Sequence, residues 1–153
     1  MSKGRYSLLA GRNQVPLSEE EVRRATNTFI GLDPSVNVRH ETAARTVFRV
    51  DRDSSGQEFG EIVFGPDIYP GSGVVDPNSA LSLDAAAAHE LTHYHRWRNK
   101  AALSDDSLEH IDEALTSLEA IQRYGRHLRE LDVLQLVSDA LQRLHLHLQN
   151  LPR

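Results

Sequence analysis

The sequence predicts a single domain of the α+β class, because a capped helix comes first, short strands follow and the rest of the chain is helical. Its 153 residues match the size of one compact domain. Apolar residues make up 39% of the chain and charged residues 25%, which is typical of a globular protein. We expect one domain over residues 1–153, with residues 1–15 as a flexible terminus.

The first predicted helix covers residues 18–30. Ser18 and Glu21 have the spacing of a capping box, and apolar side chains follow at helical intervals. Gly31 and then Pro34 are expected to end this helix, because glycine favours helix C-termini and proline cannot continue the ladder.

Three short strands are expected next, at residues 36–38, 46–50 and 60–64, where apolar side chains recur with period two. Residues 51–56 have the composition of a hairpin connection between the second and third strands, with Gly56 able to adopt a positive φ. The strands therefore form a small sheet that precedes the helical half of the chain.

Three helices complete the predicted fold. Their expected ranges are 82–98, with Ser79 as an alternative N-cap to Ser82, then 104–124, ended by Gly125, and 126–149. The order of elements is therefore one helix, three strands and three helices, which places helices and strands in separate blocks along the chain.

The last predicted helix carries an apolar seam with three- and four-residue spacing, formed by Leu134, Val137, Leu141, Leu144 and Leu148. The apolar side chains of this seam are expected to be buried against another surface. Packing across the two preceding helices would bury them, and a homodimer or a partner helix at this Leu-rich helix is the alternative.

Composition excludes several classes of function. The absence of cysteine excludes disulfides, thiolate metal ligands and a cysteine nucleophile. A net charge of −5, from 17 Lys and Arg against 22 Asp and Glu, disfavours binding to nucleic acid. No apolar run reaches the ~18 residues of a membrane span and no signal peptide is evident. We expect a cytoplasmic protein without membrane partners, with a secreted effector as the alternative.

The motif that carries chemistry is His89-Glu90-Leu91-Thr92-His93, an H-E-x-x-H sequence inside a predicted helix. Residues four apart share a helix face, so the two imidazoles of His89 and His93 converge and can hold one zinc ion at about 2.0–2.1 Å. Glu90 lies beside them, where its carboxylate can accept a proton from a water molecule.

A third protein ligand is expected, because catalytic zinc sites usually have three and keep one position open. Glu113 lies on the next predicted helix, which can fold back through a turn near residue 100. Shuffling this composition produces H-E-x-x-H in about 3% of chains, and a glutamate at this second spacing lowers that to about 0.2%. His110, one turn before Glu113, is the alternative third ligand.

Residues 85–119 resemble the gluzincin metallopeptidases of the zincin group, in which His-Glu-Leu-Thr-His is followed about twenty residues later by a ligand glutamate. The resemblance implies a minimal zincin-like domain in which His89, His93 and Glu113 bind Zn²⁺ and Glu90 is the general base. It also implies that the edge strand of the sheet, assigned to residues 60–64, lines the cleft and pairs with an extended substrate.

The chain departs from the family pattern at Ser117, where gluzincins of this type have an aspartate that orients the first histidine. Ser117 can still accept the imidazole N–H. Further candidates for supporting the site or donating to the transition state are His110, Tyr94, Tyr124 and His127. His95 and Arg96 are instead expected on a solvated helix face.

The sequence thus predicts a zinc metalloendopeptidase that hydrolyses a peptide bond in a protein or peptide substrate, using water activated by Glu90. The alternative is a catalytically inactive zincin-like regulatory or interaction module with a structural metal. Hydrolysis of a non-peptide amide is a third hypothesis.

Overall fold

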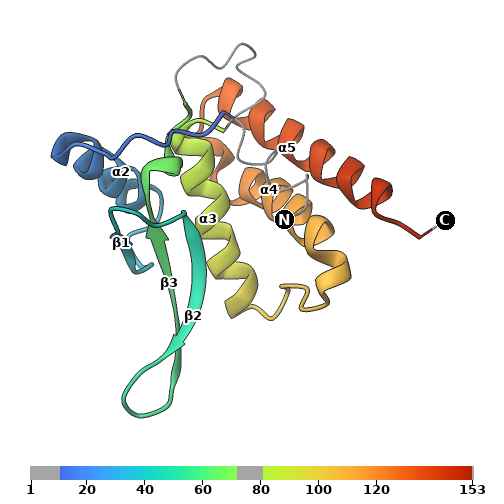
Figure 1. The fold of residues 1–153 in the computed structure, drawn as a ribbon, viewed down its shortest axis with the longest axis horizontal. Helices are drawn as coiled ribbons and strands as arrows, with labels where there is room; N and C mark the ends of the chain where they lie inside the picture. The colour runs from blue at the N-terminus through green and yellow to red at the C-terminus, as the bar shows by residue number, and fades with distance from the viewer. Residues whose placement is uncertain (1–10, 72–80, 153) are drawn as a thin grey trace.

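The structure, a computed structural model, describes residues 11–71 and 81–152. It confirms the α+β class, with four helices and one three-stranded sheet in the described part (Figure 1). The elements are α2 (Glu19–Leu32), β1 (Val38–His40), β2 (Val47–Arg52), β3 (Glu58–Phe64), α3 (Leu83–Arg98), α4 (Glu109–Tyr124) and α5 (Glu130–Gln149). Single turns of 3-10 helix lie at Pro66–Ile68 (η1), Asp106–Leu108 (η2) and Gly125–His127 (η3).

The capping box predicted for α2 is present. The Ser18 hydroxyl accepts from the Glu21 backbone N–H, and the Glu21 carboxylate accepts from the Ser18 N–H. The helix passes through Gly31, where the sequence predicted its end, and stops at Leu32 with Asp33 as C-cap. Gly31 has an ordinary negative φ, so nothing at that position breaks the helical ladder.

The sheet has the strand order β1-β3-β2, with β1 parallel and β2 antiparallel to β3. Gly56 in the β2–β3 connection has a φ of 84°, as predicted for the hairpin. The assignment of residues 60–64 to an edge strand is wrong. β3 is the central strand because β1, far from it in sequence, pairs with its second edge, so β1 and β2 are the edges.

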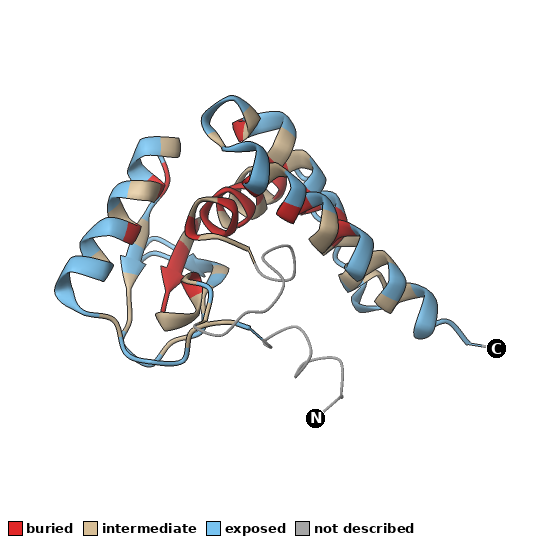
Figure 2. Cartoon of the chain, turned by 90° about the horizontal axis from the view of Figure 1, so that it is seen from above, coloured by how far each residue is buried: buried red, intermediate tan, exposed pale blue. Residues whose placement is uncertain are grey.

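Helix α3 lies at the centre of the molecule, between the sheet on one side and the α4–α5 pair on the other (Figure 1). Most of its residues are buried (Figure 2), and the four alanines of residues 85–88 let neighbouring backbone approach closely. Ser82, one of the two predicted caps, accepts from the Ala85 N–H. Ser79, the other, lies outside the described residues.

The solvated face expected at the end of α3 is wrong for Arg96 and His95. Arg96 is 6% exposed, and its guanidinium donates to Asp112 at 2.8 Å and to the Ala101 carbonyl at 3.0 Å. The His95 Nε2 lies 2.6 Å from Asp33. Sequence periodicity missed both contacts because their carboxylates come from α4 and from the end of α2.

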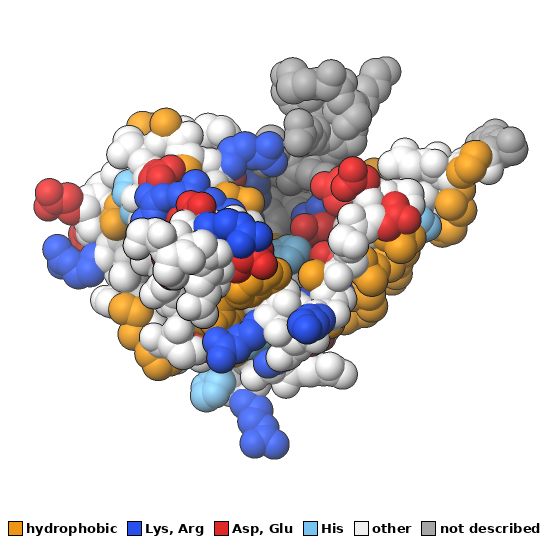
Figure 3. Space-filling view, turned by 90° about the horizontal axis from the view of Figure 1, so that it is seen from below, with side chains coloured by type: hydrophobic (Ala, Val, Ile, Leu, Met, Phe, Trp, Pro, Cys, Tyr) orange, Lys and Arg blue, Asp and Glu red, His pale blue; other side chains and the backbone are white. Residues whose placement is uncertain are grey.

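Helix α5 exposes most of its predicted seam instead of burying it, and only Leu144 is half-buried. Leu134, Leu141 and Leu148 are 51%, 62% and 64% exposed, so packing across the two preceding helices is wrong for these side chains. Hydrophobic side chains gather along the arm of the molecule that leads to the C-terminus (Figure 3). A homodimer or partner helix at this surface stays a prediction.

The chain is anchored from Arg12 onward. The Arg12 guanidinium donates to the backbone carbonyls of Asp67, Ile68 and Leu81. The flexible terminus predicted for residues 1–15 therefore does not reach Arg12, while residues 1–10 lie outside the described part. None of the described helices is long and apolar enough to cross a membrane.

Candidate metal centre

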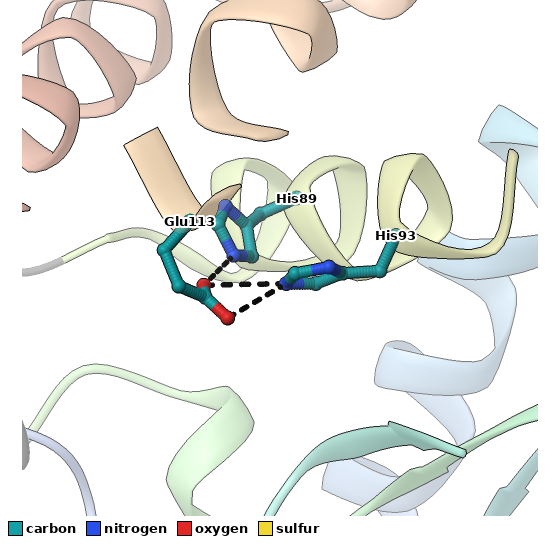
Figure 4. Close-up of side chains that lie close together, drawn as sticks. All are labelled: His89, His93 and Glu113. Carbon is teal, nitrogen blue, oxygen red and sulfur yellow. Dashed lines mark hydrogen bonds and ion pairs between the residues drawn. The ribbon is translucent and has the colours of Figure 1, made fainter. Parts of the chain in front are cut away.

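Three of the predicted site residues meet between α3 and α4. The His89 Nε2 lies 2.8 Å from the Glu113 Oε2, and the His93 Nε2 lies 3.1 Å from Oε1 and 3.2 Å from Oε2 of the same carboxylate. Figure 4 shows the two imidazoles on successive turns of α3, both directed at the carboxylate from α4. One ligand atom from each residue can be chosen so that all lie within 4.8 Å of one another.

The turn between α3 and α4 brings Glu113 to the two histidines. Lys100 in that turn has a φ of 58°, which reverses the chain direction. Asp112, the neighbour of Glu113, accepts from Arg96 of α3 and from the Leu103 backbone N–H at 3.0 Å. Because this partly buried ion pair ties the start of α4 to the end of α3, it fixes the position along α3 at which Glu113 faces His93.

The His89 ring is held on its other side by Ser117. The Ser117 Oγ lies 2.8 Å from Nδ1 and donates its hydrogen to the Asp139 Oδ2 at 2.6 Å. A hydroxyl has one hydrogen, so it can only accept from His89, and Nδ1 must be the protonated nitrogen. In the neutral imidazole, Nε2 then carries a lone pair that is directed at Glu113.

The His89 nitrogen that faces Glu113 is therefore a hydrogen-bond acceptor in the neutral ring. A lone pair on Nε2 of His89 and an ionised carboxylate repel each other at 2.8 Å unless a cation or a proton lies between them. A tetrahedral zinc site with bonds of about 2.0–2.1 Å separates its ligand atoms by about 3.3 Å. The ligand types and their spacing fit Zn²⁺ after a small outward movement.

The neighbours of Glu113 favour its ionised form. Burial by itself raises the pKa of this carboxyl, but when a proton lies on each facing imidazole nitrogen, the contacts with His89 and His93 outweigh burial and hold the pKa well below its ordinary value. Glu113 is therefore in the form that a metal ligand requires.

Glu90 lies next to this cluster, at a position from which it interacts electrostatically with His93 and Glu113. The pKa of Glu90 is raised to about 7, chiefly because the group is buried; the carboxylates of Glu113 and Asp67 add to the rise, and the interactions with His93 and Arg143 oppose it. Glu90 takes no part in the ligand cluster, so its carboxylate is available for proton transfer.

A cation from α5 also reaches the centre. The Arg143 Nη2 lies 3.9 Å from the Glu113 Oε2, and its Nε donates to the Asp139 Oδ1 at 3.4 Å. The side chain is 19% exposed, so the guanidinium lies at the edge of the site. Arg143 is thus the arginine next to both Glu113 and Glu90.

The structure places the remaining predicted residues elsewhere. The Tyr124 hydroxyl donates to Asp33 at 3.2 Å, and the Tyr94 hydroxyl accepts from Arg98 at 2.9 Å. His110 is outside the ligand cluster. Its Nδ1 is buried without a hydrogen-bond partner among the described residues. His127 is exposed in η3.

Sequence reasoning missed Asp139 and Arg143. Their spacing of four residues on one helix is visible in the sequence, but such pairs are common on solvated faces and do not indicate a site. Asp139 reaches Ser117, and Arg143 reaches Glu113, only because α5 packs along α4. Comparisons with protein-family models, with curated proteins and with solved structures found no match.

Proposed function

We propose that the protein is a zinc-dependent peptidase of minimal, zincin-like architecture, in which His89, His93 and Glu113 hold the metal and Glu90 is the general base. The observation that carries the proposal is the meeting of two imidazole nitrogens and one partly buried carboxylate within hydrogen-bond distance, with the His89 nitrogen held as an acceptor by Ser117. The gluzincin sequence pattern supports the same assignment.

When bound, Zn²⁺ acts as a Lewis acid that polarises a substrate carbonyl and lowers the pKa of water. Glu90 takes a proton from the attacking water and later gives it to the leaving amine. Arg143 stabilises negative charge on the carbonyl oxygen, because its guanidinium lies next to Glu113 and interacts with Glu90. Arg143 replaces Tyr94, Tyr124, His110 and His127 as the donor in this proposal.

The substrate is an extended peptide or protein segment. β2 has one edge that pairs with β3 and another that pairs with no described strand, so its free backbone groups are available to a peptide. Phe48 of β2 packs against Tyr94 and Trp97 of α3, which fixes this strand to the metal helix. This edge takes the role that the sequence assigned to residues 60–64.

The test is metal content combined with cleavage of an unstructured protein such as casein. Purified protein is expected to hold about one zinc per chain by mass spectrometry of the metal. Glu90→Gln should keep the zinc and lower cleavage by at least about 100-fold, since removal of a general base costs about 10²–10⁴. Glu109→Gln, the same change at an exposed position of α4, is the matched control and should retain full activity.

Zinc-free wild-type protein would contradict the metal centre. A zinc-loaded protein that cleaves nothing, or cleaves equally well with Glu90→Gln, would contradict the peptidase and favour the alternative, an inactive regulatory module with a structural metal.

A further inference from the structure

A buried hydrogen-bonded chain extends from the metal centre through α4 into α5. It connects the His89 Nδ1 to the Ser117 Oγ at 2.8 Å and the Ser117 Oγ to the Asp139 Oδ2 at 2.6 Å. Ser117 is fully buried, and the Asp139 side chain is only 14% exposed. Three helices therefore contribute one polar group each to a continuous chain that ends on a ligand imidazole.

The Asp139 carboxylate, at the end of this series of hydrogen bonds, determines which group donates and which accepts in each of them. An ionised Asp139 can only accept, so Ser117 must donate to it and accept from the His89 Nδ1. Without that carboxylate, the hydroxyl could rotate and donate to Nδ1, which would place the imidazole hydrogen on Nε2. An imidazole protonated at Nε2 has no lone pair for a metal at that atom.

Arg143 holds the same carboxylate in place. Its Nε donates to the Asp139 Oδ1 at 3.4 Å, which leaves Oδ2 for Ser117. The two residues are one helical turn apart, so both approach the centre from the same face of α5. Arg143 thereby keeps Oδ2 directed at Ser117, and the direction of the chain depends on that contact.

We propose that Asp139 is a positioning residue for the metal centre, which selects the metal-binding tautomer and the ring orientation of His89 through the Ser117 hydroxyl. The inference rests on the proposed function. It assigns to Asp139, from a different helix, the orienting role that the gluzincin pattern gives to an aspartate at the position of Ser117.

The first experiment measures zinc affinity of the metal-free protein by competition with a chromophoric chelator. Asp139→Asn and Ser117→Ala should each weaken zinc binding by about 10- to 100-fold, the usual effect of removing the partner of a ligand histidine. Asp132→Asn is the matched control, because it makes the same chemical change two turns earlier on α5. It should alter stability but leave zinc affinity unchanged.

A rescue variant separates positioning from folding. Ser117→Asp combined with Asp139→Ser exchanges the two groups, keeps the net charge and presents a carboxylate directly to His89. This double variant should recover most of the affinity that Asp139→Asn loses. If Asp139→Asn folds poorly, the zinc affinities of Ser117→Ala and the exchange variant are compared instead, and they test the same proposal.

A second readout needs no metal. Long-range ¹⁵N–¹H spectra of metal-free protein, at a pH where the imidazole is neutral, should show His89 protonated at Nδ1 in the wild type. The same spectra should show a mixture of tautomers in Asp139→Asn. Unchanged zinc affinity in Asp139→Asn, an equal loss in Asp132→Asn, or an unchanged tautomer would each overturn the proposal. Wild-type protein that binds no zinc would overturn the metal centre as well.

Discussion

His89 uses its two ring nitrogens for different purposes. Nδ1 is engaged by Ser117, while Nε2 is directed at Glu113. The ring is 4% exposed, so water cannot easily replace either contact. A buried histidine with both nitrogens engaged has a single productive orientation, which is what a ligand requires.

Asp132 is a second buried carboxylate on α5, and its contacts support the helix that carries the histidines. It accepts from the Ser82 hydroxyl at 2.6 Å and from the Arg129 backbone N–H at 3.0 Å. Burial by itself raises the pKa of Asp132, but the hydrogen bonds from Arg129 and Ser82 outweigh burial and leave the pKa below its ordinary value. Because Ser82 caps α3, this contact fixes the start of that helix to α5.

Asp132→Asn should therefore show a pH-dependent loss of stability. A carboxyl with a lowered folded-state pKa stabilises the fold above its unfolded value of about 3.9 and loses that contribution as pH falls through the folded value. At pH 7 the free energy of unfolding should drop by about 2 kcal/mol. In urea titrations the gap to the wild type should begin to narrow near pH 4 and should close as the pH falls below the lowered pKa of Asp132. A difference in unfolding free energy that stays constant with pH would contradict this role of Asp132. The control Asp51→Asn, at an exposed position, should show no such difference from the wild type.

The connection from β3 into η1 depends on close backbone packing. An added Cβ at Gly65 would lie 1.7 Å from the Ala44 carbonyl oxygen, so only a backbone shift could accommodate it. This connection carries Asp67, whose carboxylate accepts from the Thr46 backbone N–H at 2.9 Å. Gly65 thus allows the strand to enter the loop that Arg12 and Asp67 hold near α3.

Gly65→Ala should lower the free energy of unfolding by about 3 kcal/mol or more, because overpacking at a rigid backbone atom cannot relax. Gly31→Ala is the matched control. No atom lies within 4 Å of a Cβ there, and alanine should stabilise α2 by about 0.5–1 kcal/mol. Urea unfolding midpoints measure both variants. Similar effects at the two glycines would contradict the close approach to Ala44.

The candidate centre is formed where three helices pack against one another. α3 supplies His89 and His93, and α4 supplies Glu113 and Ser117. α5 adds the ion pair of Asp139 and Arg143. The unfolded chain has no such arrangement, because the two ends of the group are about fifty residues apart. A metal that binds here therefore links stability to its own concentration.

Zinc should raise the thermal midpoint of the chelator-treated protein, because it binds the folded state and separates groups that repel in its absence. At a free concentration 100 times the dissociation constant, the stabilisation is about 2.7 kcal/mol. Scanning calorimetry with increasing zinc measures the effect. Magnesium should produce none, since it prefers oxygen ligands. A midpoint independent of zinc would contradict the centre.

Local patterns in the sequence predicted the parts whose causes are local. The Ser18 capping box, the hairpin glycine at position 56 and the convergence of His89 with His93 all depend on residues fewer than six apart. The helix periodicity of 3.6 residues is enough to place two imidazoles on one face. The prediction that Glu113 completes the group added only one assumption, a helix that folds back.

The tertiary structure decided the features that depend on partners far apart in the chain. β3 is central because β1 pairs with it across more than twenty residues, and Arg96 is buried because Asp112 from α4 neutralises it. Asp139 reaches Ser117 from another helix, 22 residues on. Periodicity describes which face of an element is apolar, but it does not say which element covers that face, because packing between elements sets those contacts.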